Sequence, residues 1–240
     1  MFEPIIDKGK DSRGYNHIKG IFDSIKLPDM FDYFYENNKG KNNPYHNNTH
    51  TFNVVELVNQ YCIANDINDT LKMCYLVAAL FHDFNHSGGK KTDKENVKLA
   101  YIGFWDAWQI NRRNSFKTEN TRILPMYADL IIRLINSTEF PYKSIEDNNS
   151  TRLYKAEALR VLREADILSY EHTEWEKYVY EGLMKENDKD ANLHKDRWLI
   201  HMLDFHKKLL DSEIKTPFFI QFKEEHFPSF EKSVEIVKET

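Results

Sequence analysis

The stretch TLKMCYLVAALFHDFNH occupies residues 70–86, and its first twelve residues are apolar at nearly every helical position. A helix that is apolar all round is typical of the centre of a bundle, because a surface helix keeps one polar face. Ser87-Gly88-Gly89 follows, and glycine commonly stops a helix. We therefore expect an all-α fold with 70–81 as its central helix.

Helical spacing of apolar residues recurs along the rest of the chain. Two short helices separated by Pro28 are expected within 16–34, and a helix with one buried face within 52–64. Connectors are expected at 36–48, 139–150 and 186–192, and the further helical patterns lie at 93–110, 121–137, 151–170, 173–186 and 194–210. Without an internal repeat or a clear linker, the simplest organisation is one helical domain at 16–240 after a loosely attached arm at 1–15.

The bulk composition sets the broad class of protein. The chain has 240 residues, of which 41% are hydrophobic and 14% aromatic, enough for a substantial core. A net charge of -5 argues against a strongly basic nucleic-acid binder, so no stable nucleic-acid partner is expected. Cys62 and Cys74 lie in apolar helical patterns and are expected to be buried thiols. No signal peptide or membrane span is visible, which favours a cytoplasmic protein, and no pattern indicates its oligomeric state.

Histidines are concentrated in two short segments, YHNNTH at 45–50 and HDFNH at 82–86. The adjacent His82 and Asp83 end a buried helix, where ionisable groups are costly unless they are paired or bind metal. Imidazole and carboxylate ligands suit divalent metals such as zinc, manganese and iron, and the two oxygens of Asp83 allow it to bridge two ions. Asp166 is a further acidic candidate, because apolar residues flank it on its predicted helix.

Each candidate has an alternative interpretation when it is taken alone. A single buried histidine such as His50 is more often a hydrogen-bonded core residue than a ligand, and Asp166 is more often a surface residue or a helix cap. The joint pattern favours a metal site, because every group lies on or beside a predicted core helix.

The order of these motifs resembles the HD-domain metal phosphohydrolases, and most closely the catalytic domain of the cyclic-nucleotide phosphodiesterases. The resemblance covers about 45–186. It rests on YHNNTHTFNVV at 45–55, HDFNHSG at 82–88, LINSTE at 134–139 and ADI at 165–167, followed by a predicted helix with Trp175, Tyr178 and Glu181. It implies a single helical domain with a metal site in the bundle core.

The resemblance also implies a reaction and a role for each residue. The reaction would be hydrolysis of a phosphate ester or phosphodiester in a nucleotide-like small molecule, by water that the metal ions activate. Two divalent ions are implied, as zinc, manganese, magnesium or iron. His46 would be the general acid, His86 would lie near the second ion, Thr138 and Glu139 would support bound water, and the metal ligands would be His50, His82, Asp83 and Asp166, with Asp83 between the ions.

The chain departs from the phosphodiesterase pattern at two places. After His86 the loop is basic, and Lys90 and Lys91 form either a solvated loop or a rim that attracts phosphate. Near the C-terminus the family's base-binding Gln aligns with Lys215, which cannot act as both donor and acceptor, although the loose alignment leaves Gln221 open. Phe218 is a candidate for stacking on a base, with core packing as the alternative. The reaction class is therefore better supported than cyclic AMP or GMP as the substrate.

Two other functions fit the same scaffold. A di-iron oxygenase would need two further histidine ligands between the His-Asp pair and the last aspartate, and the sequence has no histidine between His86 and His172. A non-catalytic metal- or nucleotide-binding regulatory domain is the other alternative. Retention of His46 together with all the implied ligands argues against it.

Overall fold

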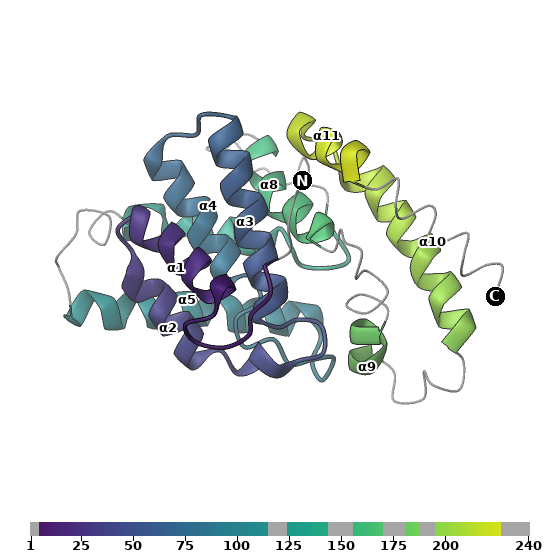
Figure 1. The fold of residues 1–240 in the computed structure, drawn as a ribbon, viewed down its shortest axis with the longest axis horizontal. Coiled ribbons are helices and arrows are strands. Elements are labelled where there is room, and N and C mark those ends of the chain that lie inside the picture. The colour runs from purple at the N-terminus through teal and green to yellow at the C-terminus, as the bar shows by residue number, and fades with distance from the viewer. Residues whose placement is uncertain (1–4, 115–123, 144–155, 170–180, 188–194, 227–240) are drawn as a thin grey trace.

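The computed structural model describes residues 5–114, 124–143, 156–169, 181–187 and 195–226. These residues form helices and loops without any β-strand, so the all-α prediction is confirmed. The helices, drawn in Figure 1, are α1 (Arg13–Ser24), α2 (Pro28–Asn37), α3 (Asn48–Ala64), α4 (Asp69–Phe81), α5 (Asp93–Asn114), α7 (Ala128–Asn136), α8 (Ala156–Leu168), α9 (Leu183–Asn187), α10 (Lys195–Glu213) and α11 (Pro217–His226), with 3-10 turns at Lys39–Asn42 and Leu124–Tyr127.

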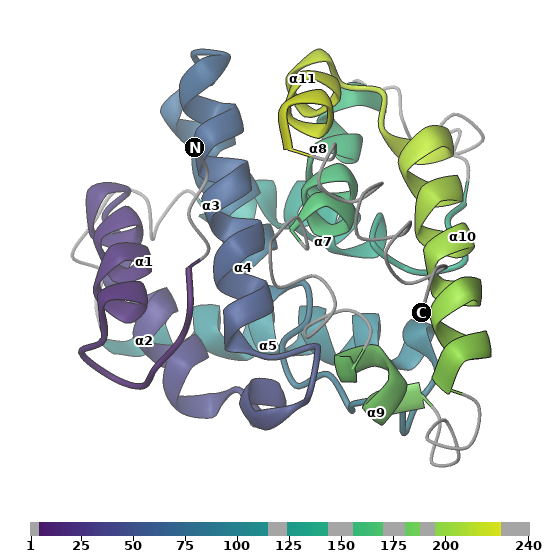
Figure 2. The same cartoon turned by 45° about the vertical axis from the view of Figure 1, so that its right-hand side comes forward.

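Helix α4 is the central helix, as its apolar sequence predicts. Every side chain from Met73 to Phe81 is buried, and α3 and α7 pack directly against it. Helix α8 packs on both α3 and α7, while α10 and α11 contact α8 on the side away from α1 and α2 (Figures 1 and 2). Because α4 ends at Phe81, the polar residues that follow emerge from the middle of the core.

Helix α3 begins earlier than its apolar pattern predicts. The side-chain oxygen of Asn47 accepts hydrogen bonds from the backbone N–H groups of Thr49 and His50, at 2.9 and 3.2 Å. Such a cap satisfies N–H groups that have no partner within the helix. It adds a turn before Phe52, so His50 lies in the first turn of α3 and His46 lies just outside the helix.

Several other boundaries also differ from the expectations. Leu124–Tyr127 is a 3-10 turn rather than the start of one long helix, and residues 186 and 187 extend α9 into an expected connector. Helix α11 was not expected; it starts at Pro217, whose fixed φ suits a first helical position. Parts of the expected helices at 121–137, 151–170 and 173–186 lie outside the described residues, with Trp175 and Tyr178 among them.

The segment before α1 is attached to α3. Ile5 and the side chain of Asn53 exchange two hydrogen bonds, at 2.9 and 3.1 Å, and the backbone N–H of Asp7 donates to Thr49 Oγ1 at 3.1 Å. Helix α1 itself starts at Arg13, inside the range expected for a loose arm. Ile5 and Asp7 are thus attached to the helical domain, because polar side chains on α3 form hydrogen bonds with their backbone.

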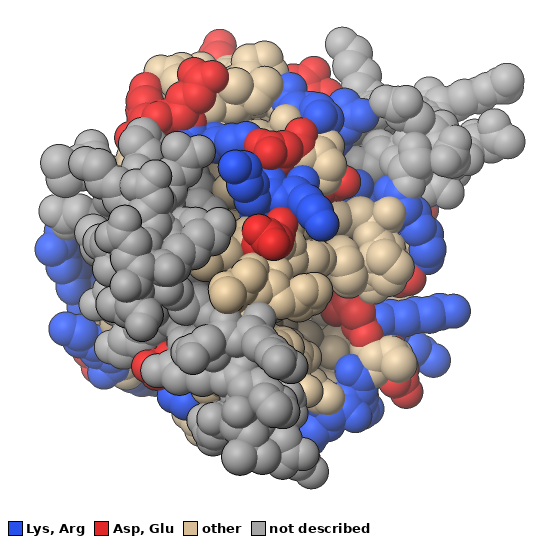
Figure 3. Space-filling model, turned by 90° about the vertical axis from the view of Figure 1, so that its right-hand side faces the viewer, with Lys and Arg blue, Asp and Glu red and all other residues tan. Residues whose placement is uncertain are grey.

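The remaining sequence-based expectations concern cysteines, surface charge and membrane spans. Cys62 and Cys74 are buried free thiols, as predicted. Lys and Arg lie next to Asp and Glu on the face shown in Figure 3, so neither sign of charge dominates the part of it that is described. Among the described helices, none has the length and apolar character needed to cross a bilayer.

Candidate metal centre and catalytic cavity

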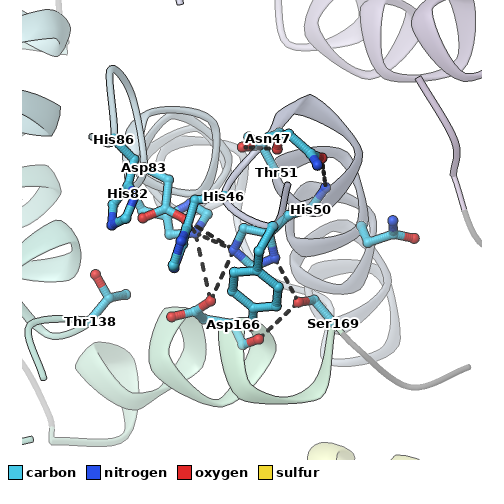
Figure 4. Close-up of polar contacts among 12 residues, drawn as sticks. His46, Asn47, His50, Thr51, His82, Asp83, His86, Thr138, Asp166 and Ser169 are labelled. Atoms are coloured by element: carbon cyan, nitrogen blue, oxygen red, sulfur yellow. Dashed lines mark hydrogen bonds and ion pairs between the residues drawn. The ribbon is translucent and has the colours of Figure 1, made fainter. Parts of the chain in front are cut away.

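Four side chains from three helices converge on one point in the core (Figure 4). His50 comes from α3, His82 and Asp83 follow α4, and Asp166 lies near the end of α8. The two histidine Nε2 atoms are 3.1 Å apart. Asp83 Oδ2 lies 3.1 and 3.2 Å from these two atoms, and Asp166 Oδ1 lies 3.2 and 3.7 Å from them. Residues up to 116 positions apart in sequence thus share one site.

The other ring nitrogen of each histidine fixes which atom faces the cluster. His82 Nδ1 donates to the carbonyl of Ala79 at 2.8 Å. Ser169 Oγ donates to the carbonyl of Asp166 at 2.8 Å, so it accepts from His50 Nδ1 at 3.1 Å. In the neutral rings both Nε2 lone pairs therefore point into the cluster, which is the arrangement of histidine ligands oriented by outer hydrogen bonds.

The donor set fits a divalent cation. Two imidazole nitrogens and two carboxylates face one another, and such a group of electron pairs needs a positive charge between its members. Asp83 Oδ2 is buried and accepts no hydrogen bond of good geometry. Burial alone would raise the pKa of Asp166, but His50 and His82 lower it to about 2 when their Nε2 atoms are protonated and donate to it. The carboxylates are thus held ionised, as ligation requires.

A second cluster lies beside the first and centres on His46. Its Nδ1 lies 2.6 Å from Glu186 Oε2, and Glu186 Oε1 accepts from the backbone N–H groups of Tyr45 and His46 at 2.8 and 3.0 Å. The Glu186 side chain is 1% exposed. Burial lowers the pKa of His46, but the charge of Asp83 and the hydrogen bond to Glu186 outweigh this effect and raise it above its ordinary value. Sequence reasoning missed Glu186, because no local pattern links it to a loop 140 positions away.

His86 stacks on His46, with ring centroids 3.7 Å apart. The backbone N–H of Gly88 donates to His86 Nδ1 at 3.2 Å, and His86 Nε2 lies 2.8 Å from the side-chain amide nitrogen of Asn96. Burial, together with the neighbouring charge of His46, lowers the pKa of His86 to about 4. His86 is therefore a neutral neighbour of His46, set apart from the four-residue cluster.

An open cavity of about 340 Å³ gives access to both clusters. His46, Asp83 and Asp166 line its floor. Its wall is largely apolar and aromatic, and includes Leu183, Phe140, Tyr142, Met202, Phe205 and Leu209. A cavity of this size, with convergent polar groups on an apolar wall, is typical of a small-molecule site.

Residues 45–98 match the 3′5′-cyclic nucleotide phosphodiesterase family. The matched range contains His46, His50, His82, Asp83 and His86, which belong to the two clusters just described. This segment of the chain is therefore similar to the cyclic-nucleotide phosphodiesterases. The chain is also similar to the cGMP-specific 3′,5′-cyclic phosphodiesterase gamma of Plasmodium yoelii, with 25% identity over 187 residues. That alignment covers 65% of this chain, which spans about a quarter of the length of the relative (23%).

The phosphodiesterase-related segment does not supply the whole site. Asp166 and Glu186 lie beyond residue 98 and reach it through α8 and α9. Asp93 was also missed; it lines the cavity and accepts a hydrogen bond from the backbone N–H of Phe140. Burial raises the pKa of Asp93 to about 6. Its position in a lysine-rich stretch hides this burial from sequence reasoning.

Four further residues were predicted to lie around the metal ligands, and only two of them line the cavity. Thr138 and Lys91 line the cavity, although Thr138 Oγ1 donates to the carbonyl of Ile135 at 2.8 Å. Glu139 does not line it and pairs with Lys143 at 2.8 Å. Lys90 is exposed and likewise does not line the cavity, so the solvated-loop interpretation fits it better.

Phe218 does not line the catalytic cavity either. It lies on α11, with its ring centroid 5.7 Å from Tyr61 and 5.1 Å from Phe219. The alternative of core packing fits this position better than substrate binding, because Tyr61 lies towards the end of α3 opposite to His50.

Proposed function

We propose that this chain hydrolyses the phosphodiester bond of a nucleotide, a cyclic nucleotide being the first substrate class to test. The observation that carries the proposal is the convergence of His50, His82, Asp83 and Asp166, with their electron pairs aimed at one point on the floor of an open cavity. The relationship to phosphodiesterases supports the same reaction class.

The four clustered side chains would hold divalent metal, and the two carboxylate oxygens of Asp83 would allow it to serve two ions. Bound divalent ions supply a water of lowered pKa and neutralise charge on phosphoryl oxygens. The outer hydrogen bonds from His82 to Ala79 and from His50 to Ser169 would keep both imidazoles oriented as ligands. These residues would thus hold the metal ions in place at the floor of the cavity.

His46 would protonate the leaving oxygen from Nε2. Glu186 holds Nδ1, so the opposite nitrogen is the one available at the cavity. The carboxylate of Glu186 stabilises the imidazolium form of His46 and helps to raise its pKa, which favours a ring that can give up a proton. Glu186 is thus a positioning residue for the general acid.

The cavity wall supports a nucleotide as the substrate class. Phe140 and Phe205 pack edge to face with centroids 5.5 Å apart, beside Tyr142. Aromatic rings in such a wall can stack on a nucleobase while the phosphate lies on the polar floor. This wall would take the place of the C-terminal base-binding segment expected around Phe218.

The test is metal analysis of the purified chain together with hydrolysis assays on cyclic AMP, cyclic GMP and bis(p-nitrophenyl) phosphate. Asp83→Ala should lose bound metal and all hydrolysis, whereas Asp106→Ala, at an exposed site on α5, should change neither. Bound metal without hydrolysis of any phosphodiester would favour a regulatory binding domain. Unchanged metal content in Asp83→Ala would overturn the proposed ligand set.

A further inference from the structure

A row of polar side chains connects the segment before α1 to the turn that carries Asp83. Asn48 Nδ2 donates to Asp7 Oδ2 at 2.9 Å, Asn38 Nδ2 donates to Asn48 Oδ1 at 3.0 Å, and the backbone N–H of Asn85 donates to Asn38 Oδ1 at 2.9 Å. Asn38 and Asn48 are each 2% exposed. Three segments that are far apart in sequence are thus joined by one row of hydrogen bonds that passes through the buried side chains of Asn48, at the start of α3, and Asn38.

The orientation of each side-chain amide in this row of hydrogen bonds follows from the Asn38 end. Asn38 Oδ1 accepts from two backbone N–H groups, those of Asn85 and of Gly40 at 3.0 Å, so the amide nitrogen of Asn38 must face Asn48. Asn48 then presents its oxygen to Asn38 and its nitrogen to position 7. Neither buried amide can turn over without bringing two donors together. Position 7 must therefore supply an acceptor.

Asp7 meets this requirement because both of its oxygens accept hydrogen bonds. Oδ2 accepts from Asn48, while Oδ1 accepts from Gly9 N–H at 2.9 Å and from the Tyr35 hydroxyl at 3.2 Å. An asparagine at this position has the same size but only one acceptor oxygen. One of the donors now facing Asp7 would then meet an N–H group, and a buried donor without an acceptor is costly.

The hydrogen-bond row ends at Asn85, in a turn with a strained backbone. Asn85 has φ 62°, a left-handed conformation that non-glycine residues adopt at a cost. Two hydrogen bonds hold it there, from its N–H to Asn38 and from the N–H of Lys39 to its Oδ1 at 2.8 Å. Asn85 lies between Asp83 and His86, so the same contacts fix the turn that presents both side chains to the cavity.

We infer that Asp7 is a positioning residue: its carboxylate supplies the acceptor that the Asp7–Asn48–Asn38 hydrogen-bond chain requires at this end. It thereby holds the turn at 82–86 in the shape that aims Asp83 at the metal cluster. The effect on the turn follows from the hydrogen bonds alone. The effect on metal binding and catalysis rests on the proposed function.

The test replaces the Asp7 carboxylate with its neutral isostere, Asp7→Asn, in the full chain. Amide hydrogen exchange of a peptide covering 82–88 should become faster, and the affinity for Mn²⁺ should fall on the order of tenfold, with kcat reduced more than KM. Asp11→Asn is the matched control, because it removes the same charge from an exposed side chain in the same segment and should change none of these readouts.

A second variant tests polarity rather than stability in general. In Asp7→Asn with Asn48→Asp, the new aspartate accepts from both position 7 and Asn38, so the chain is complete again with its charge moved into the first turn of α3, where an acid is favourable. The amide hydrogen exchange rate of 82–88 and the affinity for Mn²⁺ should both return toward the wild-type values.

The outcomes separate this inference from the proposed function. The inference would be overturned if Asp7→Asn showed the wild-type rate of amide hydrogen exchange at 82–88. It would also be overturned if the double variant exchanged these amides as fast as Asp7→Asn. If exchange responds as expected but the wild-type chain neither binds Mn²⁺ nor hydrolyses phosphodiesters, the positioning role stands and the proposed function fails.

Discussion

At the scale of single residues, the site consists of two neighbouring clusters with different chemistry. His50, His82, Asp83 and Asp166 present electron pairs to one point, whereas His46 is held by Glu186 and faces the cavity. The first arrangement suits metal binding and the second suits proton transfer. Because the two sets share no residue, metal retention and proton donation should be separable by substitution.

His46→Ala is expected to keep bound metal while slowing phosphodiester hydrolysis on the order of 10²–10⁴-fold, the usual contribution of a positioned general acid. The loss should be smaller for bis(p-nitrophenyl) phosphate than for a cyclic nucleotide, because a nitrophenolate leaves without help from a proton. Metal analysis and kcat measurements on both substrates check this. Equal losses on the two substrates, or loss of metal, would contradict the acid role.

Glu186→Gln provides the companion measurement. The charge of Glu186 raises the pKa of His46, so its removal should make His46 lose its proton at lower pH. The alkaline limb of the kcat/KM profile should therefore move to lower pH, with metal content unchanged. An unshifted limb would show that Glu186 only supports the loop at 45–46.

At the scale of secondary structure, the caps decide where the functional side chains lie. Asn47 starts α3 one turn earlier than the apolar pattern predicts, which places His50 inside the first helical turn. Asn68 caps α4 by accepting from the N–H of Leu71 at 3.0 Å, at the end of α4 opposite to His82. The two caps are chemically alike, but only the first adjoins a metal-cluster residue.

Asn47→Ala is expected to lower the free energy of unfolding by about 1 kcal/mol, the usual cost of losing an N-cap, and also to weaken metal binding. Asn68→Ala is the matched control and should cost a similar free energy without changing metal affinity. Urea unfolding and Mn²⁺ titration of both variants test this. Equal metal affinity in the two variants would show that the α3 cap contributes stability alone.

At the scale of the whole molecule, one core surrounds α4 and also encloses titratable groups unrelated to the site. Cys62 on α3 and Cys74 on α4 are almost completely buried, and burial raises the pKa of each thiol from 9.0 to about 12. In the unfolded chain the same thiols ionise near their ordinary pKa. The folded protein therefore retains protons that the unfolded chain releases at alkaline pH.

The folded state should consequently lose stability as pH rises from about 9 to about 12. The unfolded state binds fewer protons in that window, so each thiol contributes a loss of up to about 1.4 kcal/mol per pH unit. Urea unfolding at stepped pH measures this loss. Cys62→Ala with Cys74→Ala should show a shallower decline; an identical decline would assign the effect to other groups, such as Tyr61, whose pKa burial raises to about 12.

The sequence by itself determined the all-α class, the central place of residues 70–81 and the adjacency of His82 and Asp83 at a buried helix end, because periodicity and burial are local properties of the chain. It also predicted the four residues that converge. Only the tertiary structure decided that Glu186 holds His46, that Asp7 closes a hydrogen-bond chain to the turn after α4, and that Phe218 packs on Tyr61 rather than in the cavity. These contacts join residues separated by up to 157 positions (218 − 61), and their partners are set by helix packing, which no local pattern encodes.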